Sequence, residues 1–158
     1  MTIRTITDRD WSRIGELGHQ LIQMHHSFDR SRFISPDALG GDLYIARVRD
    51  ELARGHATIH VAEENGRIVG YVFAGAEPAS WKELRHEAGF IHDIVVEDAA
   101  RDSGVGQALV ASALDWFERR GVTRIMLWTA HENHGAQRLF RRLGFRPTMI
   151  EMALERQA

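Results

Sequence analysis

Two glycines stand where a β-branched stretch passes into an apolar helical pattern, in the sequence VVEDAARDSGVGQALV at residues 95–110. Glycine inside a helix gives up about 1 kcal/mol relative to alanine, so its presence needs a reason. A helix start offers N–H groups without intrahelical partners and the positive end of the helix dipole. Because Gly104 and Gly106 carry no side chains, a phosphate can reach these amides. The stretch therefore predicts an anion site at a strand-to-helix turn.

Two other phosphate-binding motifs do not match this stretch. A P-loop is excluded because no Gly-Lys-Ser/Thr sequence follows the glycines. A dinucleotide-binding fingerprint requires a third small residue where Leu109 stands, and it would follow the first strand of the chain. The nature of the anion therefore depends on the elements around the loop.

The first elements of the chain are a strand and an amphipathic helix. The strand is expected over residues 2–6, and Thr7 with Asp10 three positions on resembles a capping box that opens the helix. Five apolar residues at spacings of three and four then define one helical face. They are Ile14, Leu17, Leu21, Met24 and Phe28.

A second helix and a hairpin follow. The helix is expected over residues 42–54 and ends at Gly55. Two β-rich runs then flank Asn65-Gly66, a residue pair that suits a two-residue type I′ turn. A polar loop over residues 78–87 separates this hairpin from the rest of the chain.

The second half of the chain alternates strands and helices. Three consecutive β-branched residues, Ile94 to Val96, indicate a buried strand. The expected elements are a strand at 88–98, a helix from Val105 to Gly121, a strand at 123–130, a short helix ended by Gly144 and a last strand at 147–154. The complete order is β-α-α-β-β-β-α-β-α-β, which predicts a single α/β domain over residues 1–158 around a mixed sheet.

The composition limits the classes of function. The chain has 158 residues, a net charge of −2 and no cysteine. The charge gives no electrostatic footprint for nucleic acid or for an anionic membrane, and no apolar run resembles a membrane span or a signal peptide. A cytoplasmic location is the default expectation. The absence of cysteine excludes disulfides, thiolate zinc sites and an acyl-cysteine intermediate.

The order of motifs in the second half resembles the GNAT superfamily of N-acetyltransferases. A strand runs into R-x-x-G-x-G at residues 101–106, a further strand leads to Asn133, and a short helix is closed by LGF at residues 143–145. Members of this superfamily cradle the pyrophosphate of acetyl-CoA on such a loop. The resemblance covers nearly the whole chain, although its first half matches mainly in layout. It implies a twisted, mixed, mostly antiparallel sheet with helices on both faces, acetyl-CoA as co-substrate and no metal.

The resemblance also assigns cofactor contacts. The backbone of residues 94–96 would pair with the pantetheine arm, residues 102–107 would wrap the pyrophosphate, and Asn133 would hydrogen-bond the arm. The expected cofactor residues are Ile94, Val95, Val96, Arg101, Asp102, Ser103, Gly104, Val105, Gly106, Gln107, Asn133, Ala136 and Phe140. The chain departs from the family at Asp102-Ser103, where many members carry a basic residue or glycine. An acidic side chain opposes a phosphate, so ordinary rather than tight affinity is expected.

Acyl transfer to an amine needs a base, because an amine with a pKa of about 10.4 is neutral in roughly one molecule in 2,500 at pH 7. His92 and Asp93 are the candidates. Side chains alternate along a strand, so the two are expected on opposite faces and not in one cavity. His92 is favoured because histidine titrates in the right range and because its position resembles strand histidines that face the acceptor in arylalkylamine acetyltransferases. The oxyanion would be stabilised by backbone N–H groups near Ile94 and Val95.

Two alternatives to these base assignments are left open. In the first alternative, His92 is a core histidine whose ring is satisfied by a backbone carbonyl. In the second, the faces of the strand are reversed and Asp93 is the base. Otherwise Asp93 is expected to be a structural hydrogen-bonding residue.

The last helix lacks an expected acid. Many relatives place a tyrosine there that protonates the departing CoA thiolate, but this chain has Phe140, which has no proton to donate. Phe140 also lies on the apolar stripe of its helix, so a core role is expected for it. A thiolate with a pKa near 8.5 leaves with little help, or a water or a histidine substitutes for the tyrosine.

Acceptor contacts are expected from residues at three places in the chain. His25 and Asp29 end the first helix, Phe90 lies two residues before His92, and His131 stands beside the asparagine that ends the next strand. A solvated surface position is an equal alternative for His25, Asp29 and His131.

These residues predict an N-acetyltransferase that moves an acetyl group from acetyl-CoA to a primary amine, on a small molecule or peptide, by direct attack in a ternary complex. The alternatives are a CoA-binding module without turnover, which the missing tyrosine motivates, and a nucleotide-binding α/β domain. The acceptor amine is not identified, and a homodimer is left open. No nucleic acid, membrane or metal is expected as a partner.

Overall fold

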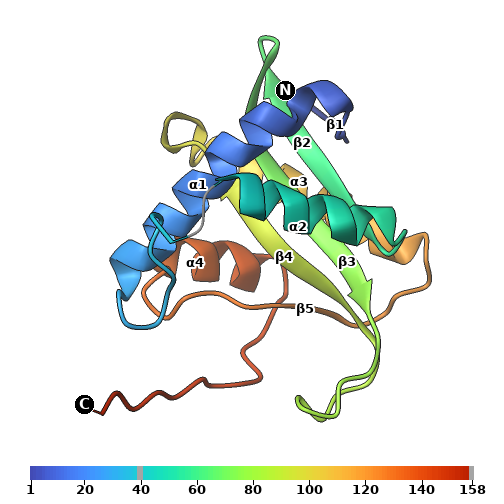
Figure 1. The fold of residues 1–158 in the computed structure, drawn as a ribbon. Helices are drawn as coiled ribbons and strands as arrows, with labels where there is room; N and C mark the ends of the chain where they lie inside the picture. The colour runs from blue at the N-terminus through green and yellow to red at the C-terminus, as the bar shows by residue number, and fades with distance from the viewer. Residues whose placement is uncertain (39–40, 157–158) are drawn as a thin grey trace.

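A computed structural model describes residues 1–38 and 41–156 of the chain, and a five-stranded sheet forms its centre (Figure 1). The strands are β1 (Thr2–Thr5), β2 (Ala57–Glu64), β3 (Arg67–Glu77), β4 (Ala88–Val96) and β5 (Ile125–Leu127). They lie side by side in chain order. The first four pair antiparallel, whereas β5 runs parallel to β4. The expected mixed, mostly antiparallel sheet is confirmed.

Helices cover both faces of the sheet. The helices are α1 (Trp11–Phe28), α2 (Gly41–Ala53), α3 (Val105–Glu118) and α4 (His134–Arg142), with single 3₁₀ turns η1 (Asp8–Asp10) and η2 (Asp98–Ala100). Residues of α1 and α2 pack with Tyr71 and Phe73 of β3 in one apolar cluster. Residues of α3 and α4 pack with Val72 and Ala74 in another. Successive residues of β3 thus point to opposite layers, as a strand buried on both faces requires.

The hairpin between β2 and β3 has the predicted turn. Asn65 and Gly66 have φ values of 51° and 77°, so both central residues adopt the left-handed conformation of a type I′ turn. The turn fixes the antiparallel register of β2 and β3, and β3 in turn positions β4, which carries the candidate base.

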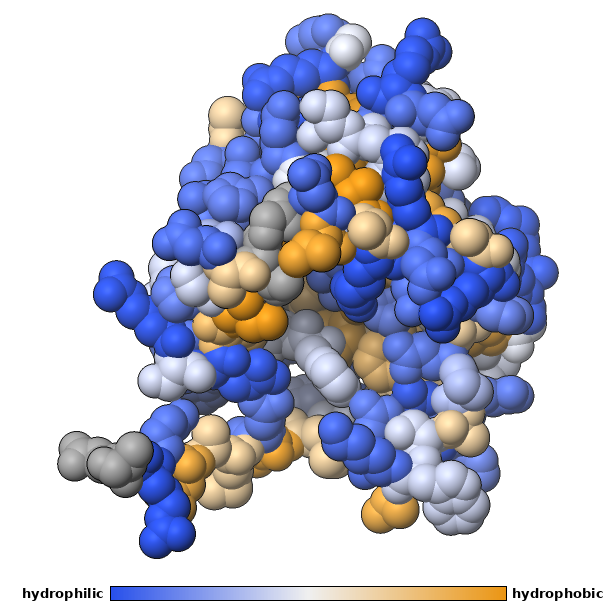
Figure 2. Space-filling model, viewed as in Figure 1, coloured by the Kyte–Doolittle hydropathy of each residue, from blue (hydrophilic) through white to orange (hydrophobic). Residues whose placement is uncertain are grey.

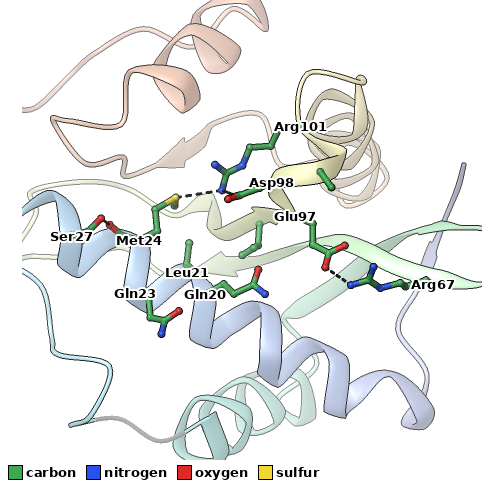
Figure 3. Close-up of a pocket in the computed structure, with 11 residues that line it drawn as sticks. Gln20, Leu21, Gln23, Met24, Ser27, Arg67, Glu97, Asp98 and Arg101 are labelled. Carbon is green, nitrogen blue, oxygen red and sulfur yellow. Dashed lines mark hydrogen bonds and ion pairs between the residues drawn. The ribbon is translucent and has the colours of Figure 1, made fainter.

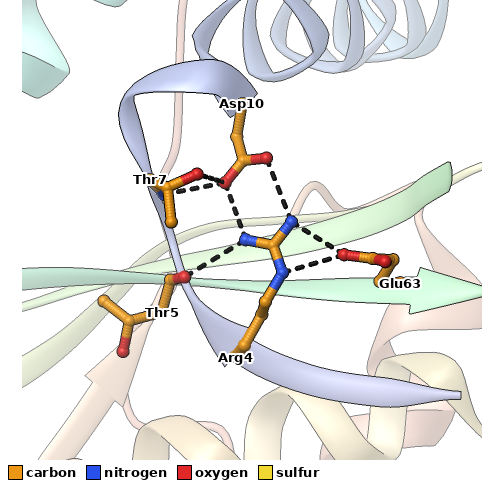
Figure 4. Close-up of polar contacts among 5 residues, drawn as sticks. All are labelled: Arg4, Thr5, Thr7, Asp10 and Glu63. Carbon is orange, nitrogen blue, oxygen red and sulfur yellow. Dashed lines mark hydrogen bonds and ion pairs between the residues drawn. The ribbon is translucent and has the colours of Figure 1, made fainter. Parts of the chain in front are cut away.

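The start of the first helix is tied to the sheet (Figure 4). Asp10 Oδ2 accepts hydrogen bonds from the Thr7 amide at 2.7 Å and the Thr7 hydroxyl at 2.8 Å, so the Asp10 half of the predicted capping box is present. Arg4 of β1 contacts the same carboxylate at 2.7 Å and Glu63 of β2 at 2.8 Å. The Arg4 guanidinium, with the bonds from Thr7, holds the pKa of Asp10 well below its usual range.

The predicted last strand is wrong for the described chain. Residues 146–156 contain no strand, and Figure 1 shows this segment leading away from the sheet. A strand forms only where its backbone N–H and C=O groups find partners, and in the described chain β5 pairs with β4 alone. The sheet therefore ends at β5.

Among residues 1–38 and 41–156, none of the helices combines the length and the apolar character needed to cross a membrane.

Candidate active site

A bulge in β4 shapes the centre of the candidate site. Phe73 of β3 pairs with Asp93, and the next residue, Ala74, pairs with Ile91, so His92 is an extra residue in the ladder. The bulge breaks the alternation of side chains at this point. His92 and Asp93 therefore lie on the same face of the sheet, the one covered by α1 and α2, and the expectation of opposite faces is wrong.

His92 sits among aromatic rings beneath α2. Its ring lies 4.8 Å from that of Phe73 and stacks on Phe90 at 6.0 Å. Its Nδ1 is 3.8 Å from Glu77 Oε1, and its side chain is 19% exposed. Burial, helped by the charge of Arg47, lowers the pKa of His92 to about 4. The imidazole is therefore neutral at pH 7, which is the form that accepts a proton.

Asp93 belongs to a buried polar chain that includes two tyrosines. The hydroxyl of Tyr44 on α2 donates to Asp93 Oδ2 at 3.0 Å and shares a short hydrogen bond with the hydroxyl of Tyr71. Burial raises the pKa of Asp93 above its ordinary value, against the opposing effects of Arg47 and of the Tyr44 hydrogen bond. Burial also raises the pKa of both tyrosines well above 10. The structural hydrogen-bonding role expected for Asp93 fits these contacts.

A cavity of about 280 Å³ opens beside His92. It lies between α2, the end of β3 and the starts of β4 and of the segment after β5. The lining residues used below are Arg47, Glu51, Glu77, Glu83, Phe90 and Trp128. Three carboxylates face two cations here, since Arg85 pairs with Glu77 and Glu83. The carboxylates around the cavity therefore outnumber the guanidinium groups by one.

The edge of β4 opens beyond the bulge. β5 pairs with β4 only from Gly89 to Ile91, through Ile125 to Leu127. Residues 94–96 pair with β3 on one side, whereas on the other side the described chain places no strand against them. This is the backbone expected to pair with an extended pantetheine arm, which would bind as an added strand does.

The start of α3 offers free amides. Gly104 adopts φ +90° before the first helical residue, and the first backbone hydrogen bond of the helix runs from Ala108 N–H to Gly104 O. The N-cap residue of α3 is Gly104, which has no side chain that could cap these amides. A Cβ built on Gly104 meets nothing within 4 Å, so the space above the turn is open. The geometry fits an anion at this helix start.

The two glycines of the loop have different reasons. Gly104 is required by its left-handed backbone, which side chains rarely adopt. A Cβ on Gly106 would lie 3.2 Å from Leu139 Cδ2, so this glycine permits close packing of α3 against α4. Close packing is thus a second reason for glycine at this position, and the expectation that Gly106 clears the approach of a phosphate stays a prediction.

The residues around the loop have other partners. Arg101 forms an ion pair with Asp98 at 2.7 Å, and its Nε donates to Val96 O at 3.3 Å. Asp102 has φ 60°, and the Ser103 hydroxyl donates to Ala100 O at 2.7 Å. The resemblance assigns these side chains to the cofactor. In the structure their contacts stabilise the turn before α3.

A second cavity, of about 570 Å³, lies between α1 and the end of β4 (Figure 3). Gln20, Met24 and Ser27 line it from the helix side, and Val95 and Arg101 line it from the other side. Arg101 Nη2 lies 3.8 Å from Met24 Sδ, across this groove. The cavity extends from Val95 near the open edge of β4 to Arg101 in the loop before α3. The end of α1 was expected to contact the acceptor, but the α1 residues that line this cavity were not named among the expected contacts.

The three expected cofactor residues at α4 have different environments. These residues are Asn133, Ala136 and Phe140. Asn133 caps α4, since its Oδ1 accepts from Ala136 N–H at 3.1 Å. Ala136 is partly buried against the core. Phe140 is 5% exposed and packs edge-on against Phe145 at 5.7 Å. The core role expected for Phe140 holds, and such burial speaks against the cofactor contact that the resemblance assigned to it.

The expected acceptor residues do not all meet. Phe90 lies in the cavity with His92. His25 Nδ1 lies 2.9 Å from Leu21 O, and Asp29 accepts the backbone N–H groups of Ser31 and Arg32, so both organise the end of α1. His131 is exposed on the loop after β5. The structure thus brings one of the four to the candidate base.

Sequence reasoning expected the first two helices to shape the acceptor site but named no residue of α2. Arg47 and Glu51 are four residues apart, so they share one face of the helix, and that face borders the cavity. Their spacing was visible in the sequence, but the strand that this face meets was not. Trp128, Glu77 and Glu83 were missed for the same reason.

Comparisons with known proteins agree with this geometry. Residues 21–145 match the model of the acetyltransferase (GNAT) family. Uncharacterized N-acetyltransferase MJ1207 from Methanocaldococcus jannaschii is 39% identical over 54% of this chain and 37% of its own length. The mycothiol acetyltransferase of Cellulomonas flavigena is 32% identical over 58% of this chain and 27% of its own. The chain thus spans well under half of these two relatives. Uncharacterized N-acetyltransferase YhfO of Bacillus subtilis is 24% identical over 92% of this chain and 89% of its own.

Solved structures share the fold. A variant of the BH1408 protein from Bacillus halodurans has a TM-score of 0.83 at 22% identity, covering 99% of this chain and 100% of its own. The aminoglycoside N-acetyltransferase AAC(6')-Iy in complex with CoA has a TM-score of 0.78 at 20% identity, covering 99% and 95%. The same enzyme in complex with a bisubstrate analogue of CoA and acetylneamine has a TM-score of 0.76 at 21% identity, covering 99% and 98%.

Proposed function

Because the chain belongs to the acetyltransferase (GNAT) family, we propose that it transfers the acetyl group of acetyl-CoA to a primary amine by direct attack in a ternary complex. The observation that carries the proposal is the arrangement around the β4 bulge. A neutral, half-buried His92 borders a cavity with an excess of carboxylates, and the unpaired edge of residues 94–96 begins directly beyond it. Acceptor and thioester would thus meet at the bulge from two sides.

Acetyl-CoA is assigned to the open edge of β4 and the start of α3. The pyrophosphate would lie on the free amides of residues 104–107, where the helix dipole favours negative charge. The pantetheine arm would pair with residues 94–96, and the larger cavity beside Val95 and Arg101 would accommodate the adjoining part of the carrier. The acetyl thioester would be supplied as a substrate and released as CoA with each turnover.

His92 is the proposed general base. It would accept the proton of the acceptor amine as the nitrogen forms a bond to the thioester carbon, and the carbon–sulfur bond would then break with release of the thiolate. Backbone N–H groups near Ile94 and Val95 would stabilise the oxyanion in between. With no cysteine in the chain, an acyl-cysteine intermediate has no nucleophile.

The second candidate function is binding of acyl-CoA without turnover. The phenyl side chain of Phe140 favours it, because it has no proton to donate to the thiolate at the position where many relatives carry a tyrosine. The thiolate of CoA is a good leaving group at neutral pH, which favours turnover.

Thiol release from acetyl-CoA separates the two functions. The assay would record free CoA across a panel of amines that includes a diamine, an aminoglycoside, an arylalkylamine and a lysine peptide. We expect acceptor-dependent release with at least one cationic amine. Saturable CoA binding without release for any amine would instead support the binding module, and absence of CoA binding would overturn both.

A further inference from the structure

The ring of His92 lies in a notch on the neighbouring strand β3. Phe73, Gly75 and Glu77 share the face of this strand that α2 covers, because every second residue of a strand points the same way. A Cβ built on Gly75 would lie 3.2 Å from His92 Nε2. The missing side chain therefore leaves the space that the imidazole occupies. Figure 2 shows this face of the molecule, which is hollowed beneath α2.

The two nitrogens of the His92 ring have different surroundings. Nδ1 lies 3.8 Å from Glu77 Oε1. Nε2 lies above Gly75, and this glycine lines the cavity together with His92. Glu51 borders the same cavity from α2, but among residues 1–38 and 41–156 Glu77 is the one carboxylate at ion-pair distance from the ring. A carboxylate thus faces one nitrogen only.

Arg85 holds the carboxylate of Glu77 in place. Its Nη2 donates to Glu77 Oε2, which is the oxygen that does not face the imidazole, and its Nε donates to Glu83. Its Nη1 donates to the backbone oxygens of Pro78 at 2.9 Å and of His86 at 3.2 Å. The Arg85 side chain is only 9% exposed, so these charge-assisted bonds are shielded from water. Oε1 of Glu77 is thereby kept toward the ring.

We propose that Glu77 is a positioning residue for His92, which keeps the proton of the neutral imidazole on Nδ1 and leaves Nε2 free to accept a proton from the acceptor amine. The partner of one ring nitrogen sets the tautomer of a histidine, and a carboxylate accepts a proton bond but cannot donate one when ionised. The inference rests on the proposed function, in which His92 is the general base.

The same carboxylate would stabilise the charged ring during transfer. The acceptor nitrogen forms its bond to the thioester carbon as its proton passes to His92 Nε2. The 3.8 Å contact then shortens to a charge-assisted hydrogen bond from Nδ1–H to Glu77. The carbon–sulfur bond breaks with its electron pair on the thiolate, and the ring returns the extra proton to solvent.

The charge of Glu77 depends on its own partner. Burial raises the pKa of Glu77, and the guanidinium of Arg85 opposes this shift and favours the ionised carboxylate. Because burial also disfavours the imidazolium of His92, a carboxylate at Nδ1 offsets part of that cost. Arg85 thus acts on the base through Glu77.

Nitrogen-15 NMR of the histidine rings tests the tautomer without acceptor or cofactor. The chemical shifts of the two ring nitrogens separate a protonated nitrogen from a bare one, and the signals of His92 are those missing from His92→Ala. We expect a protonated Nδ1 and a bare Nε2 in the natural chain at pH 7. A proton on Nε2, or equal populations of the two forms, would overturn the proposal even if the chain transfers acetyl groups. Because the measurement needs no turnover, it also decides the question if the proposed function fails.

The variant Glu77→Gln should invert the tautomer. Arg85 needs an acceptor, so the amide oxygen faces the guanidinium and the NH₂ group faces Nδ1 of His92. That group donates to Nδ1, which moves the ring proton to Nε2 and removes the bare nitrogen. We expect a protonated Nε2 and a fall in kcat of about 10²-fold or more, with a smaller change in KM for the acceptor. A proton that stays on Nδ1 in this variant would contradict the role of Glu77.

Glu83→Gln is the matched control. Glu83 pairs with the same guanidinium and lines the same cavity, but it is not at ion-pair distance from His92 in the described part of the chain. The variant removes the same charge from the cavity, so it accounts for any general electrostatic effect. We expect the proton of His92 to stay on Nδ1 and kcat to exceed that of Glu77→Gln at least tenfold. An inverted tautomer in both variants would assign the effect to Arg85 or its loop and overturn the proposal. If Glu77→Gln does not fold, the tautomer of the natural chain remains the deciding result.

Discussion

At the scale of single residues, the environment of His92 explains how a histidine can act as a base at neutral pH. Burial among Phe73 and Phe90 disfavours the imidazolium, and Arg47 adds to this effect. With a pKa of about 4, the imidazole of His92 is almost entirely neutral in the physiological pH range, so nearly every molecule can accept a proton. The low pKa makes it a weaker proton acceptor, which the direct contact with the acceptor would have to offset.

Replacement of His92 should lower turnover and not cofactor binding. We expect His92→Ala to reduce kcat about 10²- to 10⁴-fold, the usual contribution of a positioned base. The Kd for acetyl-CoA, measured by calorimetry, should remain unchanged, because the proposed carrier site begins at residue 94. The control is His86→Ala, which removes an exposed histidine. Natural turnover in His92→Ala would show that another group is the base.

The pH dependence of the reaction should reflect the low pKa of His92. A histidine whose pKa is lowered to about 4 stays neutral down to that pH, so the acid limb of kcat/KM should fall near pH 4. An ordinary histidine would place the limb near 6.5. The measurement is kcat/KM as a function of pH with one acceptor, for the natural chain and for His92→Ala. The acid limbs of the two profiles are then compared. A limb near 6.5 that disappears in the variant would keep the base but contradict the effect of burial.

Gly104 allows a matched test of the loop, because Gly121 also has a positive φ with open space around it. A β-branched residue is strained at either position by roughly 1–3 kcal/mol, so Gly104→Val and Gly121→Val should lower the free energy of unfolding similarly. Only Gly104→Val should weaken acetyl-CoA binding, by about tenfold or more in Kd. Equal Kd values for the two variants would argue against an anion site at the start of α3.

At the scale of elements, the bulge in β4 and the cluster at Arg4 do different work. The bulge turns two consecutive side chains to one face and thereby brings Asp93 under Tyr44 while His92 borders the cavity. The Arg4 cluster joins β1, β2 and the start of α1, and so holds in place the helix that lines the larger groove.

The Arg4 cluster predicts an acid-sensitive contribution to stability. Because the pKa of Asp10 is lowered in the folded chain, its contribution is complete above its ordinary pKa of 3.8 and is lost as the pH falls further. Asp10→Asn should lower the free energy of unfolding in urea by about 2 kcal/mol at pH 7, and the difference should shrink below pH 4. The exposed pair of Asp50 and Arg54 is the control, and Asp50→Asn should cost about 0.5 kcal/mol or less. A difference for Asp10→Asn that persists at low pH would mean that charge is not its origin.

At the scale of the whole molecule, the splay between β4 and β5 separates two sites that meet at the bulge. The cavity beside His92 lies on the α2 side, and the open edge of β4 continues toward α3. Direct transfer in such an arrangement requires both substrates at once. Initial rates measured against acetyl-CoA at several acceptor concentrations should therefore give intersecting reciprocal plots. Parallel plots would indicate an acyl-enzyme, for which this chain has no cysteine.

The sequence by itself determined the local features of this protein. The type I′ turn at Asn65-Gly66, the capping Asp10, the helix start at Gly104 and the core position of Phe140 depend on neighbours close in the chain, so their residue types were sufficient. The family resemblance, now confirmed by the match over residues 21–145, followed from the order of such local motifs.

The tertiary structure alone decided which distant groups meet. The bulge depends on the register between β3 and β4, and register is set by pairing across the sheet, so the sequence of β4 predicted the wrong face for one of its two candidate bases. The approach of Arg47 and Glu51 to His92 depends on how α2 packs, which its own spacing does not specify. The strand pattern at residues 147–154 stays unpaired because β-pairing needs a partner, and the presence of that partner is a property of the assembled fold.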